Sequence, residues 1–216
     1  MSAKLSHDAR VVGDLAAIVP SATVADIDRL RNLLADRADQ EGLLDVAYRT
    51  VDSPFGALLV AATDAGVVRV AFEREGHDAV LASLATAVSP RILRSGRRTD
   101  DVARELEDYF AGRRRAFEVA VDLRLARGFR RQVLSHLRDI AYGSTESYAA
   151  VAAAAGNPKA VRAAGSACSH NPVPVVVPCH RVVRSDGTLG QYGGGAEMKA
   201  ALLAMESRAI DTLTAI

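Results

Sequence analysis

One segment near the C-terminal end, residues 171–183, narrows the possible folds of this chain more than any other. It holds three prolines, a run of valines between them, and then Cys179 followed by His180. We expect a proline-bounded apolar strand that encloses the thiol, and enclosure normally raises the pKa of a thiol and makes it inert. Because neighbouring side chains on a strand point to opposite sides, His180 would serve Cys179 only through a relay or a bend in the backbone. Taken alone, Cys179 is explained as well by a small core residue.

In the first half of the chain a helical pattern gives way, from Val46, to a series of short strands. Turn signals rich in glycine and proline separate its apolar runs, and helical spacing follows them. The elements predicted here are a helix at 23–44, strands at 46–51, 57–62 and 67–72, helices at 78–88 and 100–110 with a basic loop at 89–98 between them, and a last strand at 117–123.

After Ala126 the pattern is mostly helical. Apolar residues predict one helix over 129–140, and Ser147 is placed to cap a second helix that runs to Ala155. Gly156-Asn157-Pro158 predicts a helix end, a new N-cap and a first helical position, so a third helix should run to about Ser169. Two short helices joined by so tight a turn indicate a helix-turn-helix of the winged-helix type. A further helix is predicted over 196–207.

Charge is distributed unevenly, although the net charge of the whole chain is only +1. Residues 124–216 carry a net charge of +5 and residues 1–123 one of −4. A basic module on a neutral scaffold is typical of a protein that faces a polyanion, although chance asymmetry on solvated faces would look the same.

Cysteine and histidine spacing favours no structural metal. Cys168 and Cys179 do not form a CxxC pair, and the five histidines show no metal-ligand spacing, so we expect reduced thiols and no zinc. No apolar run reaches the roughly 18 residues of a membrane helix, and charges at Asp8, Arg10 and Asp14 interrupt any signal-peptide core. We therefore expect no membrane partner and an intracellular, cytoplasmic protein.

The sequence from Asn171 through Cys179 and His180 to Tyr192 and Glu206 resembles the active-site signature of the O6-alkylguanine-DNA alkyltransferases, or methylated-DNA–protein-cysteine methyltransferases. The resemblance implies that Glu206 orients His180 and that His180 deprotonates Cys179 through a bridging water. Cys179 would then take the alkyl group from O6-alkylguanine in double-stranded DNA, with O4-alkylthymine as a second candidate substrate. Because a thioether has no good leaving group, the enzyme would act once, without a cofactor.

The same resemblance assigns the remaining site residues. Asn171 would fix the turn that carries the nucleophile, and Tyr148 would donate a hydrogen bond to the leaving guanine and rotate the 3′ phosphate. Arg162 would enter the duplex and replace the everted base, although an isolated helical arginine is more often simply solvated. The alkylguanine pocket is expected from Tyr192, Gly193, Gly194, Val182 and Pro174. DNA contacts are expected from Arg162, Tyr148, Lys159, Ala163, Gly165 and Arg131, with the third helix in the minor groove.

These patterns and the resemblance together predict an α+β chain, active as a monomer. Residues 46–124 would form a small ribonuclease-H-like domain and residues 125–216 a winged-helix domain, after a helical extension, 1–45, whose role the sequence leaves open. Three alternatives remain. Alkyltransferase-like proteins bind alkylated DNA but lack the cysteine, a winged-helix regulator would not need the Cys-His pair, and a cysteine hydrolase would need an oxyanion-hole motif that is not evident.

Overall fold

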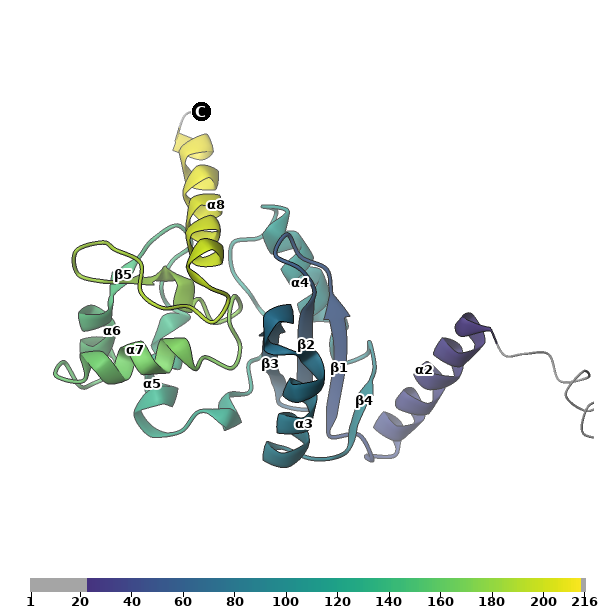
Figure 1. The fold of residues 1–216 in the computed structure, drawn as a ribbon. Coiled ribbons are helices and arrows are strands. Elements are labelled where there is room, and N and C mark those ends of the chain that lie inside the picture. The colour runs from purple at the N-terminus through teal and green to yellow at the C-terminus, as the bar shows by residue number, and fades with distance from the viewer. Residues whose placement is uncertain (1–22, 215–216) are drawn as a thin grey trace, which may run out of the picture.

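The computed structural model describes residues 23–214, and its N-terminal half is built on a four-stranded sheet (Figure 1). The strand order is β3-β2-β1-β4, in which β1, β2 and β3 run antiparallel and β4 runs parallel to β1. The strands are β1 (Val46–Val51), β2 (Leu58–Thr63), β3 (Gly66–Phe72) and β4 (Ile92–Arg94). The three strands predicted between residues 46 and 72 are thus confirmed to within one residue at each end.

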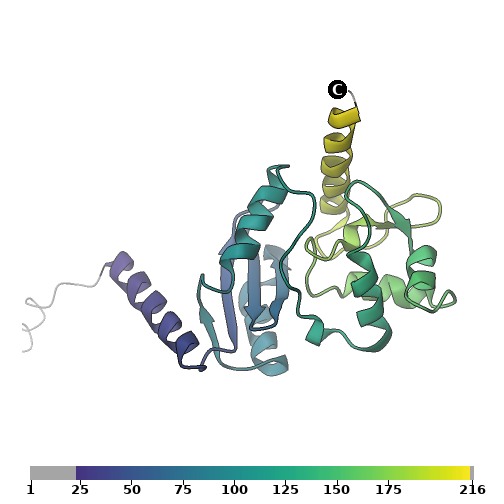
Figure 2. The same cartoon turned by 180° about the vertical axis from the view of Figure 1, so that it is seen from behind.

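Two helices cover the two faces of this sheet (Figures 1 and 2). Helix α3 (His77–Ala87) packs on the face that carries Leu59 and Ala61, and α4 (Asp100–Phe110) packs on the face that carries Leu58 and Val60. Because β2 is covered on both sides, all of its residues are buried. The core on the α4 side continues without a break into the C-terminal half, so the two halves share one apolar interior.

The C-terminal half is mostly helical, as predicted. Its elements are α5 (Gly128–Leu137), β5 (Glu146–Ser147), α6 (Tyr148–Ala154), α7 (Val161–Ser169), β6 (Val182–Val183) and α8 (Ala196–Thr214). The Ser147 hydroxyl caps α6 by accepting from the Ala150 amide at 3.1 Å, and Gly156 follows the helix at φ +86°, so both predicted signals are confirmed. Strands β5 and β6 form a small parallel pair beside the α6–α7 unit.

Helix α2 (Val24–Gln40) projects from the edge of the sheet, on the side away from α8 (Figure 1). Its C-terminal end is tied to the body by Asp39, which pairs with Arg97 and Arg98. Its large apolar side chains remain exposed, among them Leu30 at 57% and Leu34 at 61%. The predicted helix is therefore confirmed, but its apolar stripe does not face the sheet.

Three local predictions are wrong. Residues 117–123 form no strand, because only Val121 bridges to Val67 before a single 3₁₀ turn, η2 (Leu123–Leu125). The predicted loop at 89–98 contains β4, whose three residues are too few to show a period. Helix α7 begins at Val161 instead of Pro158, because the Asn157 side chain accepts from the Lys159 amide and closes a separate turn.

Among the described residues, no helix is long and apolar enough to cross a membrane, and no group of three potential metal ligands is present. Cys168 and Cys179 are both free thiols. The charged positions at 8, 10 and 14, on which the signal-peptide prediction depends, lie outside the described residues.

Candidate active site

The segment that leads to Cys179 is a folded turn, so the predicted strand is wrong. Its prolines lack the amide hydrogens that a strand ladder needs, and the chain closes on itself instead, with the Val177 amide donating to the Val173 carbonyl at 2.9 Å. Val175 sits at φ +73°, the one described non-glycine residue with positive φ. A β-branched residue there is strained, so the surrounding contacts must hold the turn in shape.

Cys179 opens a 3₁₀ turn, η3 (Cys179–Arg181), directly after this fold. In a 3₁₀ turn successive side chains are about 120° apart, whereas on a strand they point to opposite faces. The backbone bend that the sequence left open is therefore present, and it places Cys179 and His180 in one buried layer.

Asn171 holds the turn from inside. Its side-chain amide donates to the Val177 carbonyl at 2.8 Å, and its Oδ1 accepts from the Val173 amide at 3.0 Å. The same amide also donates to the Cys179 Sγ at 3.1 Å, a contact that the sequence analysis did not foresee. Asn171 therefore both shapes the turn and offers a hydrogen bond to the sulfur.

Cys179 is 2% exposed, and this burial raises the pKa of its thiol to about 11. The Asn171 hydrogen bond and the nearby Lys199 charge oppose the rise but do not cancel it. At neutral pH the resting site thus holds a thiol. Because the thiolate is the nucleophile, reaction needs a base that removes this proton.

Glu206, on α8, lies at the centre of a buried hydrogen-bond network. Its Oε1 accepts from His180 Nε2 at 2.9 Å and from the Tyr109 hydroxyl at 2.6 Å, while its Oε2 accepts from the Gly143 amide at 2.9 Å. Arg181 forms a bidentate ion pair with Glu206, in which Nε donates to Oε2 and Nη2 donates to Oε1. Burial alone would raise the pKa of Glu206, but the hydrogen bonds from His180 and Arg181 outweigh it and hold the pKa at about 2.

This network fixes the tautomer of His180. An ionised carboxylate only accepts hydrogen bonds, so the Nε2 that faces Glu206 must carry the hydrogen. Complete burial lowers the pKa of His180, which keeps the ring neutral and leaves a lone pair on Nδ1. Nδ1 is buried and has no hydrogen-bond partner among the described residues. His180 is thus a neutral imidazole with an unpartnered acceptor nitrogen in a closed site.

Two residues of the site gave no signal in the sequence. Tyr109 lies in the apolar stripe of α4, where it is indistinguishable from an ordinary core aromatic. Lys199 is completely buried on α8, where its ammonium donates to the Val182 carbonyl and lies 5.7 Å from the Tyr148 ring centre. From sequence alone, a lysine in an amphipathic helix is expected on the solvent-exposed face, and only the tertiary packing shows that Lys199 is buried.

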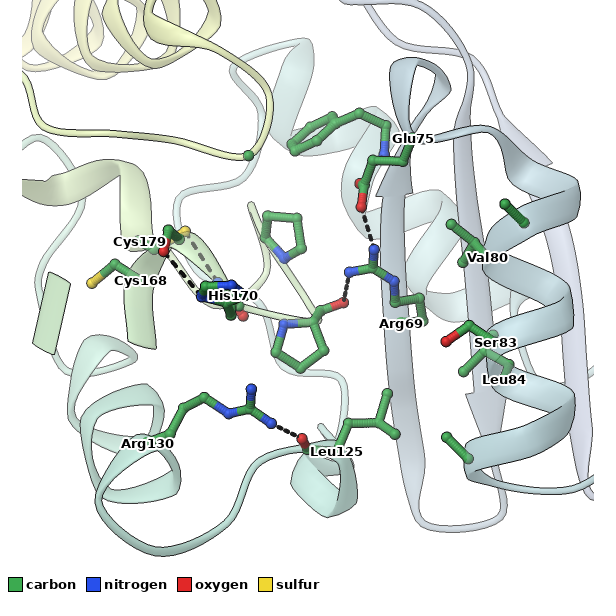
Figure 3. A pocket seen from close by; sticks show the side chains of 18 residues that line it. Arg69, Glu75, Val80, Ser83, Leu84, Leu125, Arg130, Cys168, His170 and Cys179 are labelled. Carbon is green, nitrogen blue, oxygen red and sulfur yellow. Dashed lines mark hydrogen bonds and ion pairs between the residues drawn. The ribbon is translucent and has the colours of Figure 1, made fainter. Parts of the chain in front are cut away.

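A cavity of about 490 Å³ opens beside Cys179, between the two halves of the chain (Figure 3). Of the predicted pocket residues, Pro174 and Gly193 line it. Its opposite wall comes from β3 and α3, with Phe72 and Leu84 among the lining side chains, which the sequence analysis did not anticipate. Its volume lies in the range of small-ligand pockets.

The other three predicted pocket residues, Tyr192, Val182 and Gly194, do not line the cavity. The Tyr192 ring packs 5.7 Å from Phe72 and 6.3 Å from His180 between ring centres, and its hydroxyl is buried without a partner among the described residues. Val182 is completely buried and pairs with Glu146 across the small sheet. Gly194 is packed so closely that an added Cβ would lie 2.3 Å from Met198.

Tyr148 is the first residue of α6, and its ring packs against Gly190, in the loop before Tyr192. An added Cβ on Gly190 would lie 2.1 Å from the Tyr148 hydroxyl, so this close approach requires glycine. Burial, followed by the neighbouring Cys168 and Cys179, raises the pKa of Tyr148 to about 12. The hydroxyl therefore keeps its hydrogen and is suited to donate a hydrogen bond.

Three of the six predicted DNA contacts lie on the outer side of α7 or at the turn before it. Arg162, Ala163 and Lys159 are exposed, and the Arg162 side chain makes no hydrogen bond or ion pair with any described residue. Gly165 faces inward, with an added Cβ at 3.9 Å from the Tyr148 ring. Arg131 is exposed on α5, beside a surface hollow that also includes Gly156.

Comparison with known proteins identifies the family. Residues 46–123 match the ribonuclease-like domain, and residues 128–208 the DNA binding domain, of 6-O-methylguanine DNA methyltransferase. The methylated-DNA–protein-cysteine methyltransferase of Mycolicibacterium paratuberculosis is 38% identical over 76% of this chain and 93% of that relative. The crystal structure of the Mycobacterium tuberculosis O6-methylguanine methyltransferase has a TM-score of 0.65 at 35% identity, over 76% of this chain and 94% of that one.

A second M. tuberculosis structure, of the enzyme in complex with DNA, matches with a TM-score of 0.64 at 34% identity, over the same shares. The predicted α+β fold, a ribonuclease-like domain followed by a DNA-binding domain, is confirmed by these matches. This chain therefore belongs to the 6-O-methylguanine DNA methyltransferase family, the methylated-DNA–protein-cysteine methyltransferases that repair DNA by alkyl transfer.

Proposed function

We propose that this chain repairs O6-alkylguanine in duplex DNA by one irreversible transfer of the alkyl group to Cys179. The Cys179 proton passes through a bridging water to His180 Nδ1, and Glu206 stabilises the imidazolium that forms. The thiolate attacks the alkyl carbon, an S–C bond forms, the C–O6 bond breaks, and its electron pair leaves with the guanine oxygen. Tyr148 donates a hydrogen bond to the departing guanine.

The observation that carries this proposal is the unpartnered Nδ1 of His180. A buried polar atom without a partner is costly, and such atoms in native proteins mark functional sites or ordered water. Here the orphaned lone pair lies on the residue next to the buried thiol, on a ring whose other nitrogen already faces a carboxylate. A water between Nδ1 and Sγ would satisfy the ring and would complete the proton path.

The route of the base to Cys179 also belongs to the proposal. A stacked base cannot reach a thiol that is 2% exposed, so the nucleotide must be everted. Helix α7 presents small exposed side chains, which suit close insertion into the minor groove better than base readout, and Arg162 fills the gap that the everted base leaves. All residues with a role in this proposal belong to one chain, so we expect the protein to act as a monomer.

Incubation with a duplex that carries one O6-methylguanine tests the reaction. We expect the intact mass of the protein to rise by one CH₂ group, in a one-to-one ratio to the lesion, with the adduct on the peptide that contains Cys179. Cys179→Ala should bind the duplex and gain no mass. Tight binding of the wild-type protein without an adduct would instead favour a non-catalytic lesion sensor, and a duplex with O4-alkylthymine tests the second substrate.

Arg162→Ala is expected to slow repair of duplex DNA by about 10–100-fold, because the side chain that fills the helical gap is lost. The reaction with free O6-alkylguanine base, which needs no eversion, should keep most of its rate. Single-turnover rates on the two substrates measure the difference. The matched control is Arg29→Ala, which removes the same charge from exposed α2 and should change neither rate. Equal losses on both substrates for Arg162→Ala would rule out the finger role.

A further inference from the structure

One side chain of the N-terminal domain, that of Tyr109, contacts the hydrogen-bond network around Glu206. Tyr109, on α4, is completely buried, and its hydroxyl donates to Glu206 Oε1 at 2.6 Å. The same oxygen accepts from His180 Nε2 at 2.9 Å, and the Tyr109 hydroxyl lies 3.4 Å from that nitrogen. A residue 97 positions away from Glu206 thus shares the oxygen that orients the base.

The N-terminal domain also holds the other end of the relay. The carbonyl of Pro172, at the start of the nucleophile turn, accepts from the Val70 amide at 2.9 Å and from the Arg69 guanidinium at 3.2 Å. Both donors belong to β3, and Glu75 pairs with Arg69 from the side (Figure 3). The turn that carries Cys179 and the carboxylate that orients His180 therefore rest on the same domain.

We propose that Tyr109 is a positioning residue of the alkyl-transfer relay, so that the N-terminal domain sets the reactivity of a cysteine in the other domain. The inference rests on the function proposed above. Its physical basis is the shared Oε1 of Glu206. Tyr109, His180 and Arg181 all donate to this oxygen, so the Tyr109 hydroxyl helps to hold the carboxylate in the orientation in which His180 Nε2 carries the hydrogen and Nδ1 does not.

The hydroxyl also withdraws charge from the carboxylate. Hydrogen bonds to an ionised carboxylate lower its proton affinity, so the loss of one donor raises it. The relay would then take up a proton at a higher pH, and a protonated relay cannot accept the proton of Cys179. The ionisable groups that surround Glu206 and His180 and contribute to this titration are Tyr109, Tyr142, Arg181, Tyr192 and Lys199.

Tyr109→Phe tests the proposal, because it removes the hydroxyl and keeps the ring that packs against Phe117. We expect the single-turnover rate on a duplex with O6-methylguanine to fall about tenfold at neutral pH, a part of the 10²–10⁴-fold that acid–base groups contribute. The acidic inflection of the rate–pH profile should move to higher pH. A loss of packing alone would lower the rate at every pH and leave the inflection in place.

The matched control is Tyr48→Phe. Tyr48 lies on β1 and packs against the core on the α3 side of the sheet, whereas Tyr109 lies in the core on the α4 side, so the rate and the inflection should stay unchanged. In a Glu206→Gln background, Tyr109→Phe should have no further effect on the rate, because its action passes through the carboxylate.

Two results would overturn the inference. One is a Tyr109→Phe protein that is folded by circular dichroism and has the wild-type rate and profile. The other is a rate loss that multiplies with that of Glu206→Gln, which is the behaviour of independent structural damage. In both cases Cys179 of the wild-type protein is still alkylated by the damaged DNA. If the proposed function failed, the wild-type protein itself would carry no adduct.

Discussion

Replacement of Glu206 by glutamine is expected to slow alkyl transfer about 10³–10⁴-fold and to lower the free energy of unfolding by about 3–5 kcal/mol. The first effect follows from the tautomer of His180, because a glutamine amide that donates to Nε2 would move the ring hydrogen to Nδ1 and remove the base. The second follows from Arg181, which is 5% exposed and would lose the one carboxylate with which it pairs among the described residues. Single-turnover kinetics and urea denaturation measure the two effects.

The same carboxylate makes stability depend on pH. The pKa of Glu206 is about 2 in the folded protein against an ordinary value of 4.5, so its contribution is complete above about pH 4.5 and is lost as the pH falls towards 2. Glu206→Gln should lack this component of acid unfolding. Glu197→Gln is the matched control, because Glu197 is exposed on the same helix and its replacement should leave rate and stability unchanged. A Glu206→Gln protein as stable as the wild type would contradict the network described above.

Local pattern accounts for the elements that were predicted correctly. The strands between residues 46 and 72 are covered by α3 on one sheet face and by α4 on the other, so they are short apolar runs between turn signals, and these runs are visible in the sequence itself. Ser147 and Gly156 act on their own neighbours, so capping chemistry was enough to place the ends of α6. Signals of this kind need no knowledge of the tertiary fold.

The nucleophile turn shows where local pattern fails. Its valines have the composition of a strand, but its prolines cannot join a ladder, and the choice of a turn depends on Asn171 and on the Pro172 contact with β3. The Tyr109 contact with Glu206 is less visible still, because only the packing of α4 against the C-terminal half brings the two residues together.

The structure brings Cys179, His180, Asn171 and Glu206 into one cluster. Their catalytic roles, the domain limits and the monomeric state stay predictions.

Asn171→Asp is expected to slow alkyl transfer about a hundredfold and to weaken the turn. Aspartate keeps the oxygen that accepts from the Val173 amide, but a second acceptor oxygen replaces the amide that donates to the Val177 carbonyl at 2.8 Å and to Cys179 Sγ at 3.1 Å. The thiolate would lose a charge-assisted hydrogen bond of about 1.5–3 kcal/mol and would meet a carboxylate instead. The pKa of the Cys179 thiol, already raised by burial, should rise further, so the rate–pH profile should shift to higher pH.

The rate on free O6-alkylguanine base separates this effect from DNA binding. Asn32→Asp is the matched control, because Asn32 is exposed on α2 and its replacement adds the same charge away from the site. We expect Asn171→Asp to approach the wild-type rate only at high pH, where the thiolate forms without help from the amide. If Asn171→Asp instead matched the wild-type rate at neutral pH, the thiolate would not depend on this donor, and Asn171 would serve the turn alone.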